Sequence, residues 1–403
     1  GPHRVALVAV DAAAGEQNPF LAMVDPARAA TTLLADAAVM LATSWAAEHA
    51  RRTAAQVRRA EAQCREIVLR LLMAQHLATA RQVASTLSPT LPEPLRVHVV
   101  EAGTTPRTEI VDRCAELTGR SAWIVRCPVY SRHVIVLAPG AQDRDARPLD
   151  RVVAAEFPGC TVGAGDVALR DAAVGYEQAI HALAVARRRP ERWARFDATL
   201  DLASVLGADG LAWAESVLAP LTGYVPARAT DPDADELITT ARSWLAFSTA
   251  ASRHLTIHRN TLALRVKRIE DLLGVDLARL DQQACLDLAL RIRSAPRRPG
   301  PRADRGGTVP DLDDLLRTPA AQRWAEAVLR PVRRSPQLEE TLRAWLDTGA
   351  RLSVTADALQ LSVAGARRRI ERLEGVLKRS LLHGPSARHD LWLARRTLDL
   401  GGR

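Results

Sequence analysis

The feature that most constrains the fold is a short turn followed by an amphipathic helix between Leu255 and Gly274. Apolar residues recur in it at steps of four, three and four, which places them on one face of an α-helix against a core. These residues are Leu262, Val266, Ile269 and Leu273. Gly274 supplies a C-terminal stop. The pattern predicts a helix-turn-helix over residues 249–274, the element that enters a DNA major groove.

The polar residues of this segment are placed for contact with DNA, because the start of a recognition helix faces the base edges. We expect Arg259 to form paired hydrogen bonds to a guanine, and Asn260 either to read an adenine or to cap the helix. His258 and Thr261 are expected to reach phosphate. Three further basic residues would fix the register through phosphates, or simply form a solvated helix face. They are Arg265, Lys267 and Arg268.

The same pattern returns about a hundred residues later, which indicates an internal duplication. Aligned on Leu255 and Leu359, the apolar face recurs at Ala366, Ile370, Leu373 and Leu377. The match extends upstream, where the eight residues from Trp213 resemble the eight from Trp324. Two unrelated amphipathic helices are the alternative.

The two copies differ at the start of the predicted recognition helix. His258-Arg-Asn-Thr261 is replaced by Ser362-Val-Ala-Gly365, and the basic residues lie further along. They are Arg367, Arg368, Arg369 and Arg372. The second copy is therefore expected to read a second half-site of different sequence, about 34 Å from the first on one face of the duplex. Alternatively, it contacts only the DNA backbone.

The first motif resembles the C-terminal helix-turn-helix of PucR-type regulators, the bacterial purine-catabolism and sugar-diacid family. The resemblance lies in His258-Arg-Asn-Thr261, the Arg265/Arg268-Ile-Glu270 pattern and the Leu-Gly-Val-Asp-Leu segment ending at Leu277. Upstream, residues 162–183 resemble the end of that family's degenerate diguanylate-cyclase-like (GGDEF-like) domain. The resemblance implies a transcriptional regulator, although the second copy lacks the His-Arg-Asn-Thr segment.

Composition favours an anionic partner. The formal net charge is +9 and the sequence pI is about 10.1, which suits double-stranded DNA. The five cysteines are scattered without metal-ligand spacing, so we expect reduced thiols in a cytoplasm and neither a metal nor a cofactor. We find no run of about twenty apolar residues and no signal peptide, so no membrane partner is expected.

The pattern along the chain predicts a multidomain, mainly α protein. Residues 1–26 are expected to contain a cleavage scar at Gly1–His3 and the remnant of an N-terminal sensor (GAF-like) domain. Within this remnant we expect one strand at residues 4–10, and residues 20–26 are expected to lead away from it. The remaining predicted segments are a long helical linker at 27–90, a degenerate GGDEF-like α/β domain at 91–200, a first helix-turn-helix domain at 201–293, a flexible basic linker at 294–318 and a second, divergent helix-turn-helix domain at 319–403.

The helical linker contains neither glycine nor proline from Ala27 to Ser88. Residues from Val57 to Leu71 follow a heptad rhythm, which suits a signalling helix that pairs in a homodimer, or one that packs on its own domain. The rhythm fades near Gln75–Thr79, where we expect a break.

In the α/β domain, we expect strands at 95–101, 121–126 and 133–138, and helices at 108–117, 147–157 and 171–188. This order predicts an antiparallel sheet with helices on one side. Gly163 and Gly165 are expected to serve a turn at the end of a strand and not to bind a phosphate. The hairpin Cys127–His133 has neither the glycines nor the carboxylates that a diguanylate cyclase needs for its nucleotide and metal. We therefore expect no catalytic residues and no enzyme activity.

These patterns predict a sequence-specific DNA-binding regulator, with a small-molecule effector acting through the missing N-terminal part or the central domain. The competing class is a signalling or interaction protein, or a residual nucleotide-binding module, whose helix-turn-helix units serve only for dimerisation.

Overall fold

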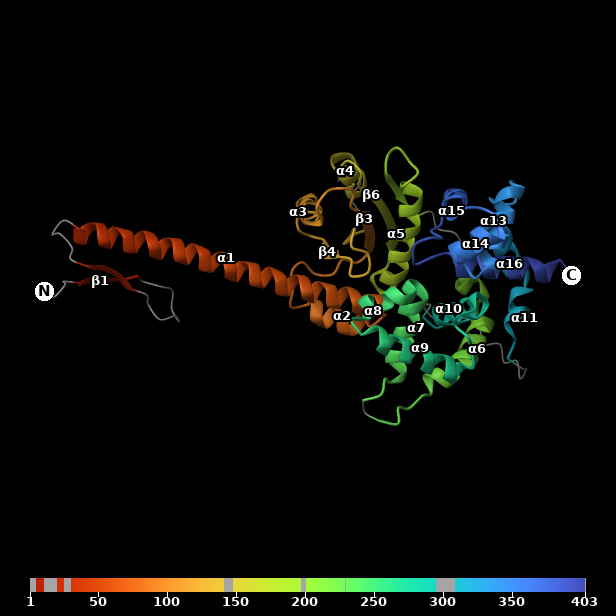
Figure 1. Ribbon diagram of the computed structural model, residues 1–403. Coiled ribbons are helices and arrows are strands. Elements are labelled where there is room, and N and C mark those ends of the chain that lie inside the picture. Colours follow the sequence, from red (N-terminus) through yellow and green to blue (C-terminus); the bar gives the residue numbers. More distant parts are fainter. Residues whose placement is uncertain are drawn as a thin grey trace. The chain divides into compact units, whose positions relative to one another are not determined.

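The computed structural model describes residues 5–10, 20–24, 30–140, 148–196, 201–228, 230–294 and 309–402 (Figure 1). The chain divides into two compact units, Gly1–Arg65 and Glu66–Arg403. The predicted scar at Gly1–His3 and most of the predicted basic linker, residues 295–308, lie outside the described residues. The fold is mainly helical with a central α/β region, as the sequence predicts.

The first unit contains a β-hairpin and most of a long helix. Strand β1 (Val5–Ala9) pairs antiparallel with β2 (Phe20–Val24). The prediction that residues 20–26 simply lead away from a single strand is wrong, because this apolar stretch forms the second strand. Helix α1 (Ala30–Met73) starts in this unit and runs without a glycine or proline.

The predicted break in the helical linker is confirmed. Gln75 has a left-handed backbone (φ 64°), after which the chain re-enters a helix at α2 (Leu77–Ala84). The last turns of α1 bury Val68, Leu69 and Leu72 in the core of the α/β region. Val57 and Ile67, two members of the heptad pattern, are exposed. The end of α1 therefore packs on its own domain.

The α/β region is built on a sheet with strand order β4-β5-β3-β6-β7. Its strands are β3 (Leu95–Glu101), β4 (Trp123–Arg126), β5 (His133–Pro139), β6 (Thr161–Val167) and β7 (Trp193–Arg195). Neighbouring strands are antiparallel except β6 and β7, which are parallel. The sequence predicted the first three of these strands and missed β6 and β7.

Helices cover both faces of this sheet, so the prediction of helices on one side is wrong. Successive side chains of a strand point to opposite faces of the sheet. Val100, Val134 and Val136 lie on one face, against α3 (Arg107–Leu117) and α4 (Leu149–Glu156). The neighbouring residues Val99 and Ile135 point to the other face, against α5 (Ala172–Ala186) and the end of α1. A sheet buried on both sides explains why the strands are apolar almost throughout.

Gly163 and Gly165 lie within β6, not in a turn. A Cβ atom on Gly163 would come within 2.1 Å of the backbone oxygen of Ala179, and one on Gly165 within 2.6 Å of the Gln178 side chain. The two glycines therefore let α5 approach the sheet backbone closely.

Two helical modules follow the α/β region. The first contains α6 (Leu202–Thr222), α7 (Ala234–Phe247), the short 3-10 helix η2 (Ser248–Ala250), α8 (Ala251–Leu255), α9 (Arg259–Leu273) and α10 (Leu280–Ser294). The second contains α11 (Leu312–Leu316), α12 (Pro319–Leu329), α13 (Pro336–Asp347), α14 (Leu352–Ala358), α15 (Val363–Leu377) and α16 (Arg388–Gly401). Helix α11 occupies the end of the stretch predicted as linker.

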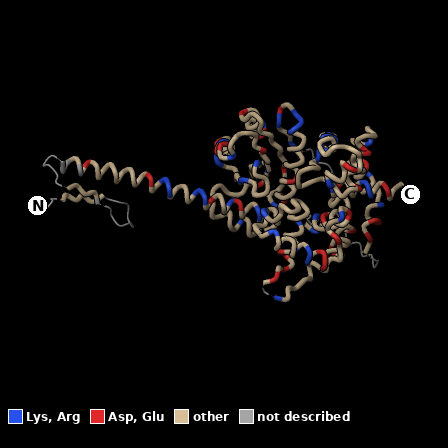
Figure 2. The backbone as a smooth tube through the Cα atoms, viewed as in Figure 1, with Lys and Arg blue, Asp and Glu red and all other residues tan. Residues whose placement is uncertain are grey.

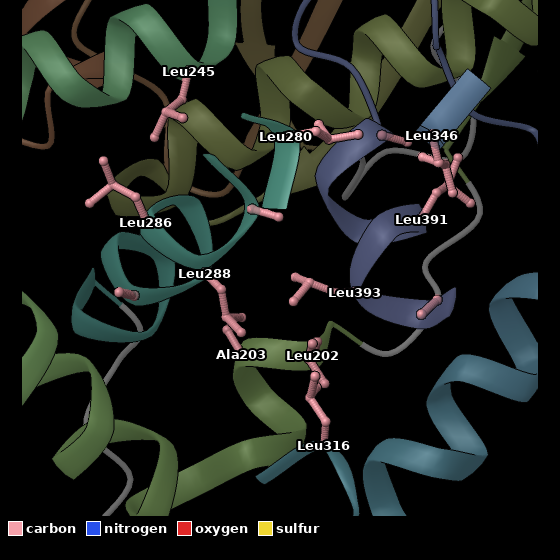
Figure 3. Close-up of a cluster of buried hydrophobic side chains, with 14 of the residues drawn as sticks. Leu202, Ala203, Leu245, Leu280, Leu286, Leu288, Leu316, Leu346, Leu391 and Leu393 are labelled. Atoms are coloured by element: carbon pink, nitrogen blue, oxygen red, sulfur yellow. The ribbon is translucent and has the colours of Figure 1, made fainter. Parts of the chain in front are cut away.

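The two modules share one hydrophobic core (Figure 3). Leu286 and Leu288 of α10 and Leu391 and Leu393 of α16 contribute to it, together with Leu202 at the start of α6. The closing helices are also duplicates, since Leu-x-Leu-Ala-x-Arg occurs at 286–291 and again at 391–396. The duplicated modules thus form one packed body.

Helix α6 departs from the expectation that the chain has no apolar stretch of membrane-spanning length. By length and apolarity alone it resembles a membrane-spanning segment. Its buried residues, including Trp213, Leu218 and Leu221, belong to the core that the modules share. Their apolar character is explained by this packing.

Candidate nucleic-acid interface

The turn between α8 and α9 is defined by three residues. Thr256 takes a left-handed conformation (φ 56°) that ends α8, and the amide of Ile257 donates back to Ser252 O at 3.0 Å. His258 then becomes the N-cap of α9 in an extended conformation. Helix α9 ends at Gly274, also left-handed (φ 65°), so the predicted stop is confirmed.

The apolar face predicted for α9 is turned towards the interior. Leu262 and Ile269 are buried, at 5% and 0% exposure, and Val266 and Leu273 are half-buried. Ile269 packs in the core of the two modules, whereas Leu262 packs in the cluster that includes Phe247 and Ala251. The opposite side of the helix is left for solvent or a ligand.

The predicted reading residues, His258 to Thr261, are all exposed. His258 Nδ1 accepts a hydrogen bond from the amide of Asn260 at 3.3 Å. His258 therefore occupies the capping position, and Asn260 lies two residues into the helix. Of the two roles predicted for Asn260, helix capping is therefore performed by His258 instead. Among the described residues, Arg259 has no ion-pair partner.

The other predicted basic residues of α9 have partners within the chain. Arg265 pairs with Glu236 of α7 at 2.9 Å, and Lys267 pairs with Asp271 at 3.1 Å. The Arg268 guanidinium lies 5.9 Å from the centre of the Tyr224 ring. Arg265 is the most enclosed of the three, with 19% of its side chain exposed, and it joins α9 to the helix behind it.

The second motif repeats this geometry. Gln360, the residue equivalent to Thr256, is also left-handed (φ 53°), and so is Lys378 at the position of Gly274. Ser362 is the N-cap of α15, and its hydroxyl accepts from the amide of Gly365 at 3.1 Å. The face predicted from the repeat, Ala366, Ile370, Leu373 and Leu377, is buried. This agreement supports the duplication.

The basic residues of α15 lie along its outer side. Arg367, Arg368 and Arg372 are exposed and Arg369 is half-buried. In the described part of the chain none of the four forms an ion pair. They contrast with the partnered basic residues of α9. Figure 2 shows basic and acidic residues interspersed over the modules and the α/β region.

The structure adds a contact that sequence reasoning missed, because the second module docks on the α/β region. The amide of Ser380 donates to His181 Nδ1 of α5 at 3.0 Å. Arg188 donates to the backbone oxygen of Glu371 in α15, and the Arg379 guanidinium lies 4.5 Å from the centre of the Phe196 ring. These contacts join residues about two hundred positions apart, so no local sequence pattern signals them.

The hairpin that would hold a nucleotide in a cyclase takes part in this docking. Tyr130 at its tip is hydrogen-bonded to Gly384 of the second module. Arg132 Nε donates to the backbone oxygen of Ala102 at 2.8 Å. Burial raises the pKa of the Glu101 carboxyl, but the Arg187 guanidinium, which donates to it at 2.8 and 3.2 Å, and the His133 ring, whose Nε2 lies 3.9 Å away, hold this pKa below its usual range. The hairpin thus binds protein groups.

Comparison with protein families identifies the class of these domains. The PucR C-terminal helix-turn-helix domain matches twice, at residues 237–292 and 338–397, and a GGDEF-like domain matches at 73–185. The chain is therefore a PucR-type protein carrying two copies of the family's helix-turn-helix domain, and it belongs among transcriptional regulators. A search of curated proteins gave no match.

Among solved structures, the chain is similar to a regulator of polyketide synthase expression from Bifidobacterium adolescentis. The two are 16% identical, the match covers 58% of this chain and 98% of the other, and the TM-score is 0.24. At that TM-score the likeness adds nothing to the assignment, which rests on the family matches.

Proposed function

We propose that this chain is a cytoplasmic, bacterial regulator of transcription that binds double-stranded DNA in a sequence-specific manner, mainly through α9. The observation that carries the proposal is the exposed segment His258–Thr261 at the N-terminal end of a helix whose opposite face is anchored in the core. A helix held in this way presents its first turn to the major groove.

Within that segment, Arg259 would provide the main sequence discrimination. Its exposed guanidinium has no ion-pair partner among the described residues, and a bidentate contact to guanine discriminates by about 1–3 kcal/mol per base. Asn260 would read an adenine, because His258 already caps the helix. His258 and Thr261 would contact phosphate.

The remaining basic residues would position the protein on the backbone. Lys267 can exchange its exposed partner Asp271 for a phosphate. Arg265 is held by Glu236 and serves mainly to fix α9 on α7. In the second module, Arg367, Arg368 and Arg372 form no ion pair with any described residue and suit contacts with the DNA backbone, because Ser362 to Gly365 offers no long polar side chain.

We also propose that the protein acts as a homodimer through α1. Large apolar side chains are exposed along this helix, among them Leu33, Met40, Trp45 and Val57, at 67%, 70%, 47% and 51%. A second α1 would cover them, as in a coiled coil. We propose no enzyme activity, since the hairpin Cys127–His133 lacks the glycines and acids of a cyclase.

The decisive experiment selects DNA from a random oligonucleotide pool and then titrates the enriched sequence against a scrambled one at two salt concentrations. We expect Arg259→Ala to lose the preference for the enriched sequence while keeping most non-specific affinity. Arg368→Ala is the matched control. It should lower the affinity for both DNAs equally and reduce the salt dependence of binding by the equivalent of about one phosphate contact. Equal losses for both DNAs with Arg259→Ala would contradict base reading.

The docking of the second module on the α/β region favours one alternative, an interaction protein whose helix-turn-helix units only make protein contacts. Failure to enrich any sequence, together with binding that does not depend on salt, would support this alternative.

A further inference from the structure

A pocket of about 220 Å³ lies where the joint between α1 and α2 meets α7 and the end of α10. Its wall includes Gln75 from the joint, Thr239 and Arg242 from α7, and Arg293 and Ser294 from α10. All of these residues belong to the second compact unit. No predicted site residue lines the pocket, so the proposed DNA contacts do not account for it.

Arg242 brings a positive charge to this wall that no carboxylate among the described residues neutralises by direct contact. Its Nη1 donates to Gln75 Oε1 at 3.0 Å, and its Nη2 donates to the backbone oxygen of Leu290 at 3.2 Å and to Ser294 Oγ. All three acceptors are neutral. Burial lowers the pKa of the guanidinium to about 10, because its charge is desolvated without a direct counterion. An anion in the pocket would supply that counterion.

The rest of the lining is also suited to a small anion. Arg293 is exposed beside the pocket and adds a second guanidinium, while Thr239 and Ser294 bring hydroxyl groups. Asp235 is an exposed carboxylate in the same wall, so the two arginines outweigh it by one charge. The planar fork of arginine matches the oxygens of carboxylates and phosphates.

We propose that this pocket binds a small anionic ligand, a carboxylate or a phosphate, through Arg242 and Arg293. The pocket connects the joint between α1 and α2 to the helix that supports α9. Gln75, which accepts from Arg242, is the left-handed residue at the break between α1 and α2. On the same helix as Arg242, Glu236 binds Arg265 of α9.

A ligand that competes with Gln75 for Arg242 therefore acts at once on the joint of the long helix and on the helix that supports α9. This leads to a regulatory role, which rests on the proposed function: occupancy of the pocket changes the affinity of α9 for DNA. Binding of the anion itself does not depend on that function.

The first test measures binding by calorimetry on the full chain, with inorganic phosphate and with acetate as separate probes. Sodium chloride keeps the ionic strength constant. We expect saturable binding of at least one probe, weakened about tenfold or more in Arg293→Ala and in Arg242→Gln. Arg343→Ala is the matched control, because Arg343 is the duplicate of Arg242, is exposed on α13, and lies outside this pocket. It should bind like the wild type.

Arg293 is exposed, so its variant tests the site even if Arg242→Gln fails to fold. Equal binding by the wild type and Arg293→Ala, or no saturable binding of either probe, would overturn the anion site. A second test repeats the DNA titration with and without the bound probe. Anion binding without any DNA binding would refute the proposed function and its regulation but leave the site intact. An unchanged DNA affinity would refute the coupling alone.

Discussion

The Tyr130 hydroxyl forms two hydrogen bonds with the backbone of Gly384. It donates to the Gly384 carbonyl at 2.8 Å and accepts from the Gly384 amide at 3.0 Å. The two residues are 254 positions apart and belong to the α/β hairpin and to the loop before α16. A hairpin of the GGDEF-like domain is thus a docking point for a helix-turn-helix module.

Removal of this hydroxyl should loosen the docking. Tyr130→Phe leaves two partly buried backbone groups of Gly384 without a partner, which costs about 1–3 kcal/mol. We expect faster amide hydrogen exchange in residues 380–387, with little change in the β-sheet. Tyr224→Phe is the control, because the ring of Tyr224 lies under Arg268 and the change keeps that ring. Unchanged exchange in Tyr130→Phe would show that the apolar contacts alone hold the module.

The repeated glutamate of the two modules performs the same task in each. Glu270 Oε1 accepts from the amide of Leu277 at 2.9 Å, and Glu374 Oε1 accepts from Leu381 at 2.7 Å and from Leu382 at 3.0 Å. Each carboxylate thus fixes the chain that follows α9 or α15.

Glu374→Ala should therefore be the more harmful of the two truncations. It leaves two amides unpaired beside the buried carboxylate site, and we expect a loss of about 2–5 kcal/mol in the free energy of unfolding. Glu270→Ala removes one bond and should cost about 1 kcal/mol. Glu374→Gln keeps an accepting oxygen and should recover most of the loss in chemical denaturation. A Gln variant as unstable as the Ala variant would argue against the hydrogen bonds.

Two glycines of this chain should respond in opposite directions to the same substitution. Gly163→Ala places a methyl group 2.1 Å from the Ala179 backbone oxygen, so α5 must move off the sheet, at a cost of about 3 kcal/mol or more. Gly365 lies in the first turn of α15, where the nearest neighbour of an added Cβ is Ser362 Oγ at 3.2 Å. Gly365→Ala should be neutral or should stabilise by up to about 1 kcal/mol. Thermal unfolding of both variants distinguishes the two sites, and a harmless Gly163→Ala would contradict the close packing.

Gly163 also shows where prediction from the sequence fails. The repeat, the apolar face of α9 and the break at Gln75 follow from local spacing, and the structure has them where the sequence placed them. Gly163 and Gly165 were assigned to a turn because glycine favours turns, whereas here it permits a close helix–sheet contact made by a distant segment. Strand β6, which contains both glycines, was missed for the same reason. The Lys267–Asp271 pair was visible in the sequence at i, i+4 spacing, but the docking of Tyr130 on Gly384 was not.

A cluster of charges between α10 and α16 should make the stability of the modules depend on pH. One arginine, Arg291, pairs with Asp201 at 3.1 Å, with Asp287 at 3.0 Å and with Asp390. Burial, together with the neighbouring carboxylates, raises the pKa of Asp287 to about 7. Its ordinary value is 3.8, so between these values the folded chain holds a proton that the unfolded chain has released. Ionisation of Asp287 thus lowers stability as the pH rises towards 7.

The Asp287→Asn variant isolates this effect. His389, 3.8 Å from Asp287, has a pKa held well below its usual value by burial and by Arg388, and it contributes the opposite slope over part of the range. The informative quantity is therefore the difference in unfolding free energy between variant and wild type. We expect it to shift progressively in favour of Asp287→Asn between pH 4.5 and pH 7, by at most about 1.4 kcal/mol per pH unit. A shift in favour of the wild type would mean that Arg291 stabilises the charged form of Asp287 more than burial opposes it.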